Sequence, residues 1–203
     1  MIFLRKIIMV VMSAACISMS AADSDTYDPF DLNLEQNINT PAVPSKSQSM
    51  VKENIDRIKS HLERQGFRPT RTRRGEVLLL TIPCEQLFRA NESVISTRGV
   101  ELLKKFTLPA ESIGKYKILI AVHSDDTGEI EYTDNLTADR ANAIDDLFSA
   151  ENKFEGMSVV PYGIGRDEPL VRNDSVKNRA QNRRVEIYIF PEEELFSKRK
   201  TVK

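Results

Sequence analysis

Apolar residues change their spacing along the chain, and each spacing predicts a different kind of element. From Val51 to Leu62 they recur every three or four positions, which predicts an amphipathic helix that ends at Gly66. The continuous apolar run over residues 77–82 is typical of a strand that is buried on both faces. A second apolar run over 117–122 predicts a buried strand over 116–123. Because the helix has a single apolar stripe, we expect it to pack against such a sheet.

The same reading of the second half of the chain predicts helices and strands in alternation. The expected elements are a helix that Ser96 or Thr97 caps and Pro109 ends, a helix over 133–149, a strand over 157–162, a helix over 175–182 and a strand over 185–190. The order is therefore β-α-β-α-β-α-β. We expect an α+β fold in which the helices pack on one face of a small mixed sheet.

The first 22 residues have the features of a signal peptide. Arg5 and Lys6 precede a short apolar stretch over 7–19, and small residues stand where a signal peptidase would cleave after Ala22. Cleavage there would leave Asp23 as the first residue of an exported protein. We therefore expect the protein in the periplasm, in association with the cell wall or the outer membrane.

Cys16 allows a second interpretation, in which residues 13–16 are a lipoprotein box and the cysteine is lipidated. Ser13 stands where such a box usually has a large aliphatic residue, so plain secretion is favoured. Either route exports the protein. Membrane contact is expected only if Cys16 is lipidated, because no apolar run approaches the roughly 20 residues of a membrane span.

Composition divides the remainder of the chain into four parts. Residues 23–46 are rich in Asp, Asn, Ser, Thr and Pro, and we expect a flexible tether without a core. Residues 47–75 are expected to form the amphipathic helix and a hairpin extension. The folded domain is expected over 76–191, and 192–203 is a charged tail that we expect to be disordered beyond its first turn.

Charge, cysteine and histidine usage argue against several functions. With 29 basic and 30 acidic residues, nothing favours nucleic acid as a partner. Cleavage after Ala22 would leave Cys84 without a second cysteine for an internal disulfide. His61 and His123 stand in no metal-binding spacing, and no nucleophile–base set is evident. We expect no catalytic residues, no metal and no cofactor.

Two side chains of opposite charge stand where the second strand gives way to a helix. Asp125 follows the strand that ends at His123, Gly128 lies in the turn, and Arg140 lies inside the helix. Such a junction is a usual place for a binding site in an α/β sheet. From the residues alone, a site that uses both charges and a plain salt bridge between them both remain open.

Three motifs surround this junction. They are His-Ser-Asp-Asp-Thr-Gly at 123–128, Leu-Thr-Ala-Asp-Arg-Ala at 136–141, and Arg-Ala-Gln-Asn-Arg-Arg-Val-Glu-Ile at 179–187, the last preceded by Gly-Ile-Gly at 163–165. In this order and spacing they resemble the OmpA-like peptidoglycan-binding domain, which also occurs in Pal and MotB. The resemblance covers about residues 77–190. One departure is Thr133, where the family often has asparagine.

The resemblance implies a ligand, the stem peptide of peptidoglycan, and chiefly its meso-diaminopimelate. The free end of that residue carries an ammonium and a carboxylate on one carbon. Asp125 matches the family aspartate that takes the ammonium, and Arg140 matches the arginine that takes the carboxylate. Further contacts are implied for Phe88, Asn91, Ser124 and Leu136, with Asn182, Arg183 and Arg184 in supporting positions.

The expected function is therefore non-catalytic binding of peptidoglycan, which would anchor the cell wall to the outer envelope. The alternative is a periplasmic protein-interaction module of an outer-membrane complex in which wall binding is weak or lost. In that case the helix over 47–62 would be the contact surface, and outer-membrane proteins are candidate partners. An enzyme acting on the wall is disfavoured because the chain lacks a recognisable catalytic set.

Overall fold

The computed structural model describes residues 32–151 and 154–196. The expected signal peptide, the lipoprotein box at Cys16, and residues 23–31 and 197–203 of the expected tether and tail lie outside the described residues. In the described part, five strands form one sheet in the order β1-β2-β5-β3-β4. The strands are β1 Thr70–Thr72, β2 Val77–Pro83, β3 Tyr116–His123, β4 Val159–Gly165 and β5 Arg184–Pro191.

The α-helices of the described residues fall before and between these strands. They are α1 Leu34–Asn39, α2 Gln48–Arg64, α3 Cys84–Leu87, α4 Thr97–Lys105, α5 Ile130–Ala150 and α6 Val176–Asn182. Short 3-10 turns lie at Ser45–Ser47, Arg73–Gly75, Ala110–Ser112 and Glu193–Leu195. The predicted α+β class and the predicted strands over 77–82, 116–123 and 185–190 are confirmed.

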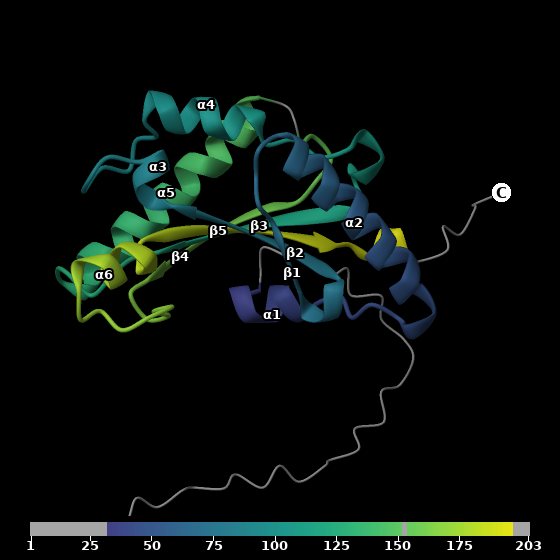
Figure 1. Cartoon of the computed structure of the whole chain (residues 1–203), viewed down its shortest axis with the longest axis horizontal. Coiled ribbons are helices and arrows are strands. Elements are labelled where there is room, and N and C mark those ends of the chain that lie inside the picture. The colour runs from purple at the N-terminus through teal and green to yellow at the C-terminus, as the bar shows by residue number, and fades with distance from the viewer. Residues whose placement is uncertain (1–31, 152–153, 197–203) are drawn as a thin grey trace, which may run out of the picture.

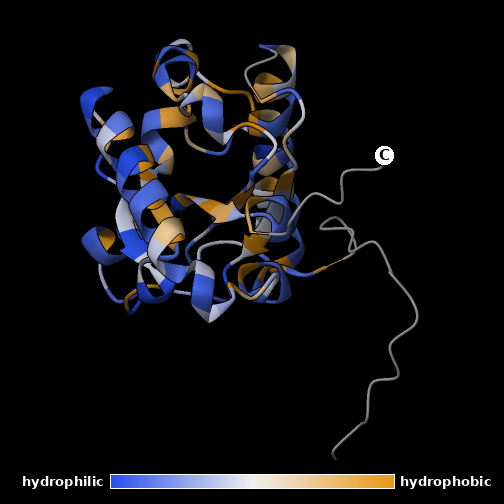
Figure 2. Ribbon diagram, turned by 90° about the vertical axis from the view of Figure 1, so that its right-hand side faces the viewer, coloured by the Kyte–Doolittle hydropathy of each residue, from blue (hydrophilic) through white to orange (hydrophobic). Residues whose placement is uncertain are grey.

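The sheet is mixed because the last strand enters its middle. β5 pairs antiparallel with both β2 and β3, whereas β3 pairs parallel with β4 at the edge. The side chains of α2, α4 and α5 share one apolar core with one face of the sheet, and Figure 1 shows α4 above the strands. Figure 2 shows the hydrophobic strands enclosed by helices that carry hydrophilic residues as well.

Helix α1, which the sequence pattern did not predict, lies on the other face of the sheet. Leu34 of α1 packs with Leu119, Ala121 and Val160 on the opposite face of the sheet, and Figure 1 shows α1 below the strands. The prediction of a flexible tether over 23–46 is therefore wrong for residues 32–46. We call residues 32–47 the N-terminal strap.

Hydrogen bonds hold the strap, which explains why its polar composition misled the prediction. Asn33 caps α1 in a reciprocal capping box with Gln36. The ammonium of Lys117, on β3, donates to the carbonyl of Thr40 at 2.8 Å and also to the Asn37 side chain. A segment with few apolar residues can be ordered when its polar groups meet such partners.

Gly163 and Gly165 belong to β4, which is longer than the predicted strand over 157–162 at this end. A Cβ atom at Gly163 would lie 2.4 Å from the backbone nitrogen of Ala138 on α5, so only glycine lets helix and strand approach this closely. The backbone N–H of Gly165 donates to the Thr137 hydroxyl at 3.0 Å. These contacts fix the first half of α5 beside the end of β3, where the candidate site lies.

Candidate functional site

One pocket lies where the ends of β2 and β3 meet the beginning of α5. Its volume is about 330 Å³. All six ligand residues expected from the sequence line it: Phe88, Asn91, Ser124, Asp125, Leu136 and Arg140. Cys84, Glu85, Arg89, Ala90, Thr127, Tyr132, Thr133 and Arg183 complete the lining. Residues from four separate stretches of the chain therefore converge on one cavity.

The extension of β3 holds Asp125 in the lining of this pocket. The N–H of Ser124 donates to the carbonyl of Gly165 at 2.6 Å, which continues the pairing with β4 past His123. Asp125 is 2% exposed. Its Oδ1 accepts from the backbone N–H of Thr127 at 2.9 Å and from the Thr127 hydroxyl, and its Oδ2 forms an ion pair with Arg183.

These partners keep the Asp125 carboxylate ionised. Burial alone would raise the pKa of Asp125, but the hydrogen bonds from Thr127 and the nearby Arg183 outweigh it, so the pKa lies below its usual value. The pocket therefore presents a negative charge at neutral pH. A carboxylate in this state accepts hydrogen bonds and can take an ammonium group.

Arg140 reaches the same pocket from α5 and is 5% exposed. Its Nε donates to the carbonyl of Glu92 at 2.9 Å and its Nη2 donates to the carbonyl of Arg89 at 3.1 Å. The guanidinium carbon lies 4.9 Å from the centre of the Phe88 ring, which is a cation–π distance. Arg140 therefore also holds the loop of residues 89–92 in place.

The plain salt bridge between Asp125 and Arg140 is absent. Asp125 pairs with Arg183, and within the described part of the chain no carboxylate lies at ion-pair distance from Arg140. A guanidinium has five N–H donors, and the two backbone carbonyls use two of them. The guanidinium still has donors for a ligand, including a pair at the end of the side chain that can bind two oxygens at once.

The two arginines expected to support the site point in different directions, because successive residues of an extended chain face opposite sides. Arg183 lines the pocket. Arg184 lies away from it, where its Nε pairs with Glu186 at 2.7 Å and its guanidinium donates to the carbonyl of Glu168. Arg184 thus holds the loop before α6.

Asn182 supports the same loop. Its Oδ1 accepts from the N–H of Val171 at 3.0 Å, and its Nδ2 donates to the carbonyl of Val171 and to the side chain of Asn173. Asn182 is completely buried and does not line the pocket. Its structural role is to connect the end of α6, and so the position of Arg183, to the preceding loop.

Sequence reasoning missed several lining residues. Thr127 stands two positions after Asp125, and this spacing is typical of an aspartate that accepts a hydrogen bond from its own turn. The Thr133 hydroxyl donates to the carbonyl of Ile130 at 2.8 Å, so it is committed to the first turn of α5.

Burial raises the pKa of the Cys84 thiol to about 11 against the opposing effect of nearby arginines, so Cys84 stays protonated at neutral pH.

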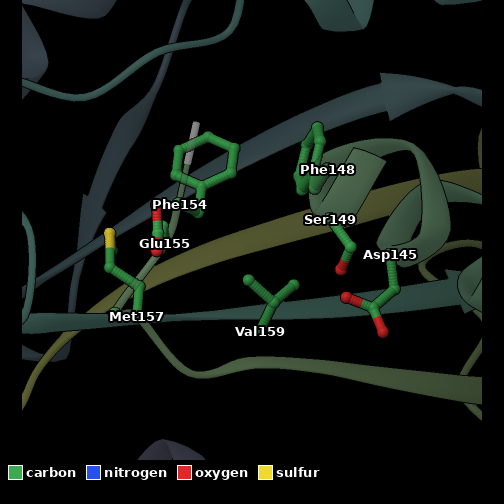
Figure 3. Close-up of a pocket in the computed structure, with 8 residues that line it drawn as sticks. Asp145, Phe148, Ser149, Phe154, Glu155, Met157 and Val159 are labelled. Atoms are coloured by element: carbon green, nitrogen blue, oxygen red, sulfur yellow. The ribbon is translucent and has the colours of Figure 1, made fainter. Parts of the chain in front are cut away.

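A second pocket, of about 380 Å³, lies at the other end of α5. Figure 3 shows Asp145, Phe148 and Ser149 of the helix on one side and Met157 and Val159 on the other. The described residues that line it include two acidic side chains, Asp145 and Glu155, and no basic one. Its described lining residues therefore do not present the two opposite charges that a zwitterion needs.

Comparisons with known proteins agree with the resemblance. Residues 87–183 match the model of the OmpA family. YfiB of Escherichia coli (strain K12), which is named as a lipoprotein, is 25% identical over 103 residues, which are 51% of this chain and 64% of YfiB. The chain thus spans less than two thirds of that relative's length.

Two solved structures show the same fold. A MotB-like protein from Desulfovibrio vulgaris superposes with a TM-score of 0.59 at 19% identity, over 72% of this chain and 98% of the other. The cell wall anchor of the T6SS from Pseudomonas aeruginosa superposes with a TM-score of 0.52 at 22% identity, over 70% and 97%. In the described residues, none of the helices is long and apolar enough to span a membrane.

Proposed function

Because residues 87–183 match the model of the OmpA family, we propose that the pocket of this chain binds the stem peptide of peptidoglycan by the zwitterionic end of meso-diaminopimelate. Binding is non-catalytic in this proposal. Asp125 takes the ammonium, and the remaining donors of Arg140 take the carboxylate. The protein would then anchor the cell wall from the periplasm.

The observation that carries the proposal is the state of Arg140. It is almost fully buried, and its positive charge meets two carbonyls and an aromatic ring but no acidic side chain of the described residues. A buried charge without a counter-charge is costly, and a bound anion relieves that cost. The carboxylate of a zwitterion supplies the anion while its ammonium finds Asp125 in the same cavity.

The chemistry also favours diaminopimelate over lysine as the stem residue. Each charge-assisted hydrogen bond contributes roughly 1.5–3 kcal/mol. A lysine side chain ends in an ammonium alone, so it satisfies Asp125 and leaves Arg140 without a counter-charge. The similar protein from Pseudomonas aeruginosa is a cell wall anchor, which supports a wall ligand for this chain as well.

Attachment to the outer membrane would require a further element, either a lipid anchor or a protein partner. YfiB is named as a lipoprotein, and lipidation of Cys16 would give this chain the same kind of anchor. A soluble form starting at Asp23 would instead depend on outer-membrane proteins as partners. Mass spectrometry of the mature N-terminus distinguishes a lipidated Cys16 from a free Asp23.

Retention on purified sacculi tests the binding proposal. We expect Asp125→Asn and Arg140→Lys each to weaken retention by roughly 10-fold or more, since each loses about 1.5–3 kcal/mol of charge-assisted contact. The matched controls are Asp126→Asn and Arg98→Lys, which change exposed residues that do not line the pocket. Urea unfolding of every variant separates lost binding from lost folding.

The same experiment decides between the two candidate functions. Sacculi that contain lysine in place of diaminopimelate should retain the protein less well. If folded Asp125→Asn and Arg140→Lys proteins are retained as well as the original chain, the assigned site is wrong. If the original chain itself is not retained, the protein-interaction module becomes the better description.

A further inference from the structure

The lining of the pocket carries one more positive than negative side chain. Its basic residues are Arg89, Arg140 and Arg183, and its acidic residues are Glu85 and Asp125. Glu85 and Arg89 are both exposed, so water screens their charges. Asp125 and Arg140 are buried, and Arg183 is half-buried and paired with Asp125, so these three side chains carry the charges that a bound ligand would meet inside the pocket. A zwitterion neutralises one of each sign and leaves one arginine over.

The main chain of Arg183 is held by hydrogen bonds on both sides, so its side chain has a fixed point from which to bind a ligand. Its N–H donates to the carbonyl of Arg179 at 3.1 Å at the end of α6, and its carbonyl accepts from the N–H of Cys84 at 3.0 Å. Its main chain is thus fixed between α6 and the beginning of α3. Its side chain remains 38% exposed, so it can meet a ligand that enters the pocket.

Without a ligand, Arg183 makes an ion pair with Asp125 through Nη1. The other donors of its guanidinium make no hydrogen bond to a side chain of the described residues. When a ligand ammonium reaches Asp125, it shares this carboxylate with Arg183. The arginine then retains donors and positive charge for a second anionic group beside the zwitterion.

We propose that Arg183 binds a second carboxylate of the stem peptide, so that the pocket selects stems with a free carboxylate next to the diaminopimelate zwitterion. This inference rests on the proposed function of the pocket. Two carboxylates in a stem have this chemistry. One is the α-carboxylate of the D-glutamate that precedes diaminopimelate, and the other is the carboxylate at the L-centre of diaminopimelate when that residue ends the peptide.

Isothermal titration of the purified full chain with three synthetic stems tests the proposal. The first is the tripeptide L-Ala-γ-D-Glu-meso-diaminopimelate, which has both carboxylates. The second carries an amide in place of the glutamate α-carboxylate, and the third carries an amide at the L-centre. We expect one of the two amides to raise the dissociation constant by about tenfold, and this amide identifies the carboxylate that Arg183 contacts.

The variant Arg183→Gln should bind the tripeptide and its amides with equal affinity, because the group that distinguishes them is gone. Arg183→Lys should retain part of the preference, since it keeps the charge and loses the fork. Arg172→Gln, an exposed residue outside the pocket lining, is the matched control and should behave as the original chain does.

The outcomes separate this inference from the proposed function. If the original chain binds all three stems equally well, the second carboxylate site is wrong and the zwitterion site stands. The same conclusion follows if Arg183→Gln keeps the preference for a free carboxylate. If the original chain binds none of the stems, both the proposed function and the inference fail.

Discussion

At the scale of single residues, the pocket depends on how one carboxylate is held. Asp125 is buried, yet the pKa of its carboxyl group lies below the usual value because Thr127 donates two hydrogen bonds and Arg183 adds a positive charge, which together outweigh burial. Thr127 is exposed and follows in the same turn. A residue outside the expected ligand set therefore controls the charge of a residue inside it.

This arrangement predicts how wall binding depends on pH. Since the pKa of Asp125 is lowered, Asp125 stays ionised in mild acid, and retention on sacculi should be unchanged from neutral pH to about pH 5. Thr127→Val removes the hydroxyl donor and moves the pKa upward. Its retention should therefore begin to fall at a higher pH than that of the original chain.

The control is Thr70→Val, which changes an exposed threonine on β1. Retention is measured as the bound fraction at each pH after the folded state has been checked by circular dichroism. Identical pH profiles for Thr127→Val and the original chain would contradict the role given to Thr127.

At the scale of elements, the N-terminal strap is held mainly by polar contacts. Arg73 donates to the carbonyls of Ile38 and Asn39 at 2.7 and 3.3 Å, so a positive charge lies at the C-terminal end of α1. Lys117 contacts Asn37 and Thr40 from β3, and burial lowers the pKa of its ammonium to about 8. The strap thus supplies hydrogen-bond acceptors to Arg73 and Lys117, and it covers a face of the sheet on which the other helices of the shared core do not pack.

Asn37 is the residue whose loss should detach the strap. It is completely buried and its side chain contacts both Lys117 and Tyr162. Asn37→Ala removes a partner of the buried Lys117 ammonium and of the half-buried Tyr162 hydroxyl, and should lower the free energy of unfolding by about 1–3 kcal/mol. Urea unfolding and hydrogen exchange of the α1 amides measure the two effects.

Asn39→Ala, an exposed position on the same helix, is the matched control and should change stability by less than about 0.5 kcal/mol. Wall binding should survive in both variants, since the strap does not line the pocket. An Asn37→Ala protein with the original stability and the original exchange rates would refute this account of the strap.

These elements also show what the sequence could and could not predict. The strands over 77–82 and 116–123 were predictable because continuous apolar runs need burial on both faces. The strap was not, because its order depends on Lys117 and Arg73, which lie far away in the sequence. In the same way, motif spacing predicted that Asp125 and Arg140 approach one another, whereas the pairing of Asp125 with Arg183 depends on side-chain placement.

At the scale of the whole molecule, a second group of charges lies in the middle of the sheet. Glu186 on β5 pairs with Arg184, accepts from the Tyr188 hydroxyl at 2.7 Å and lies 3.3 Å from His123. Burial alone would raise the pKa of Glu186, but these neighbours lower it from 4.5 to about 2. Glu186 is 8% exposed, so its ionisation affects the stability of the entire fold.

Acid unfolding should therefore depend on Glu186. The pKa of Glu186 is lower in the folded state than in the unfolded state, which contributes about 3 kcal/mol to the free energy of unfolding. This contribution is complete above about pH 4.5 and is lost as the pH falls toward 2. Glu186→Gln should lower stability at pH 7 by an amount of this order. It should also flatten the decline between pH 4.5 and 2.

Urea midpoints measured from pH 7 to pH 2 give both quantities. Glu101→Gln, at an exposed position on α4, serves as the control and should reproduce the decline of the original chain. A Glu186→Gln protein that still loses the same stability between pH 4.5 and 2 would show that other groups cause the acid transition.

The position of the strap has a mechanical consequence. The chain enters the described fold through α1, on the face of the sheet opposite α2, α4 and α5. A pull on the N-terminal side reaches the strap before it reaches any strand, so the contacts of Lys117, Arg73 and Tyr162 with the strap carry the tension first. Their rupture would release residues 32–47 as slack of up to roughly 50 Å while the sheet and the pocket stay folded.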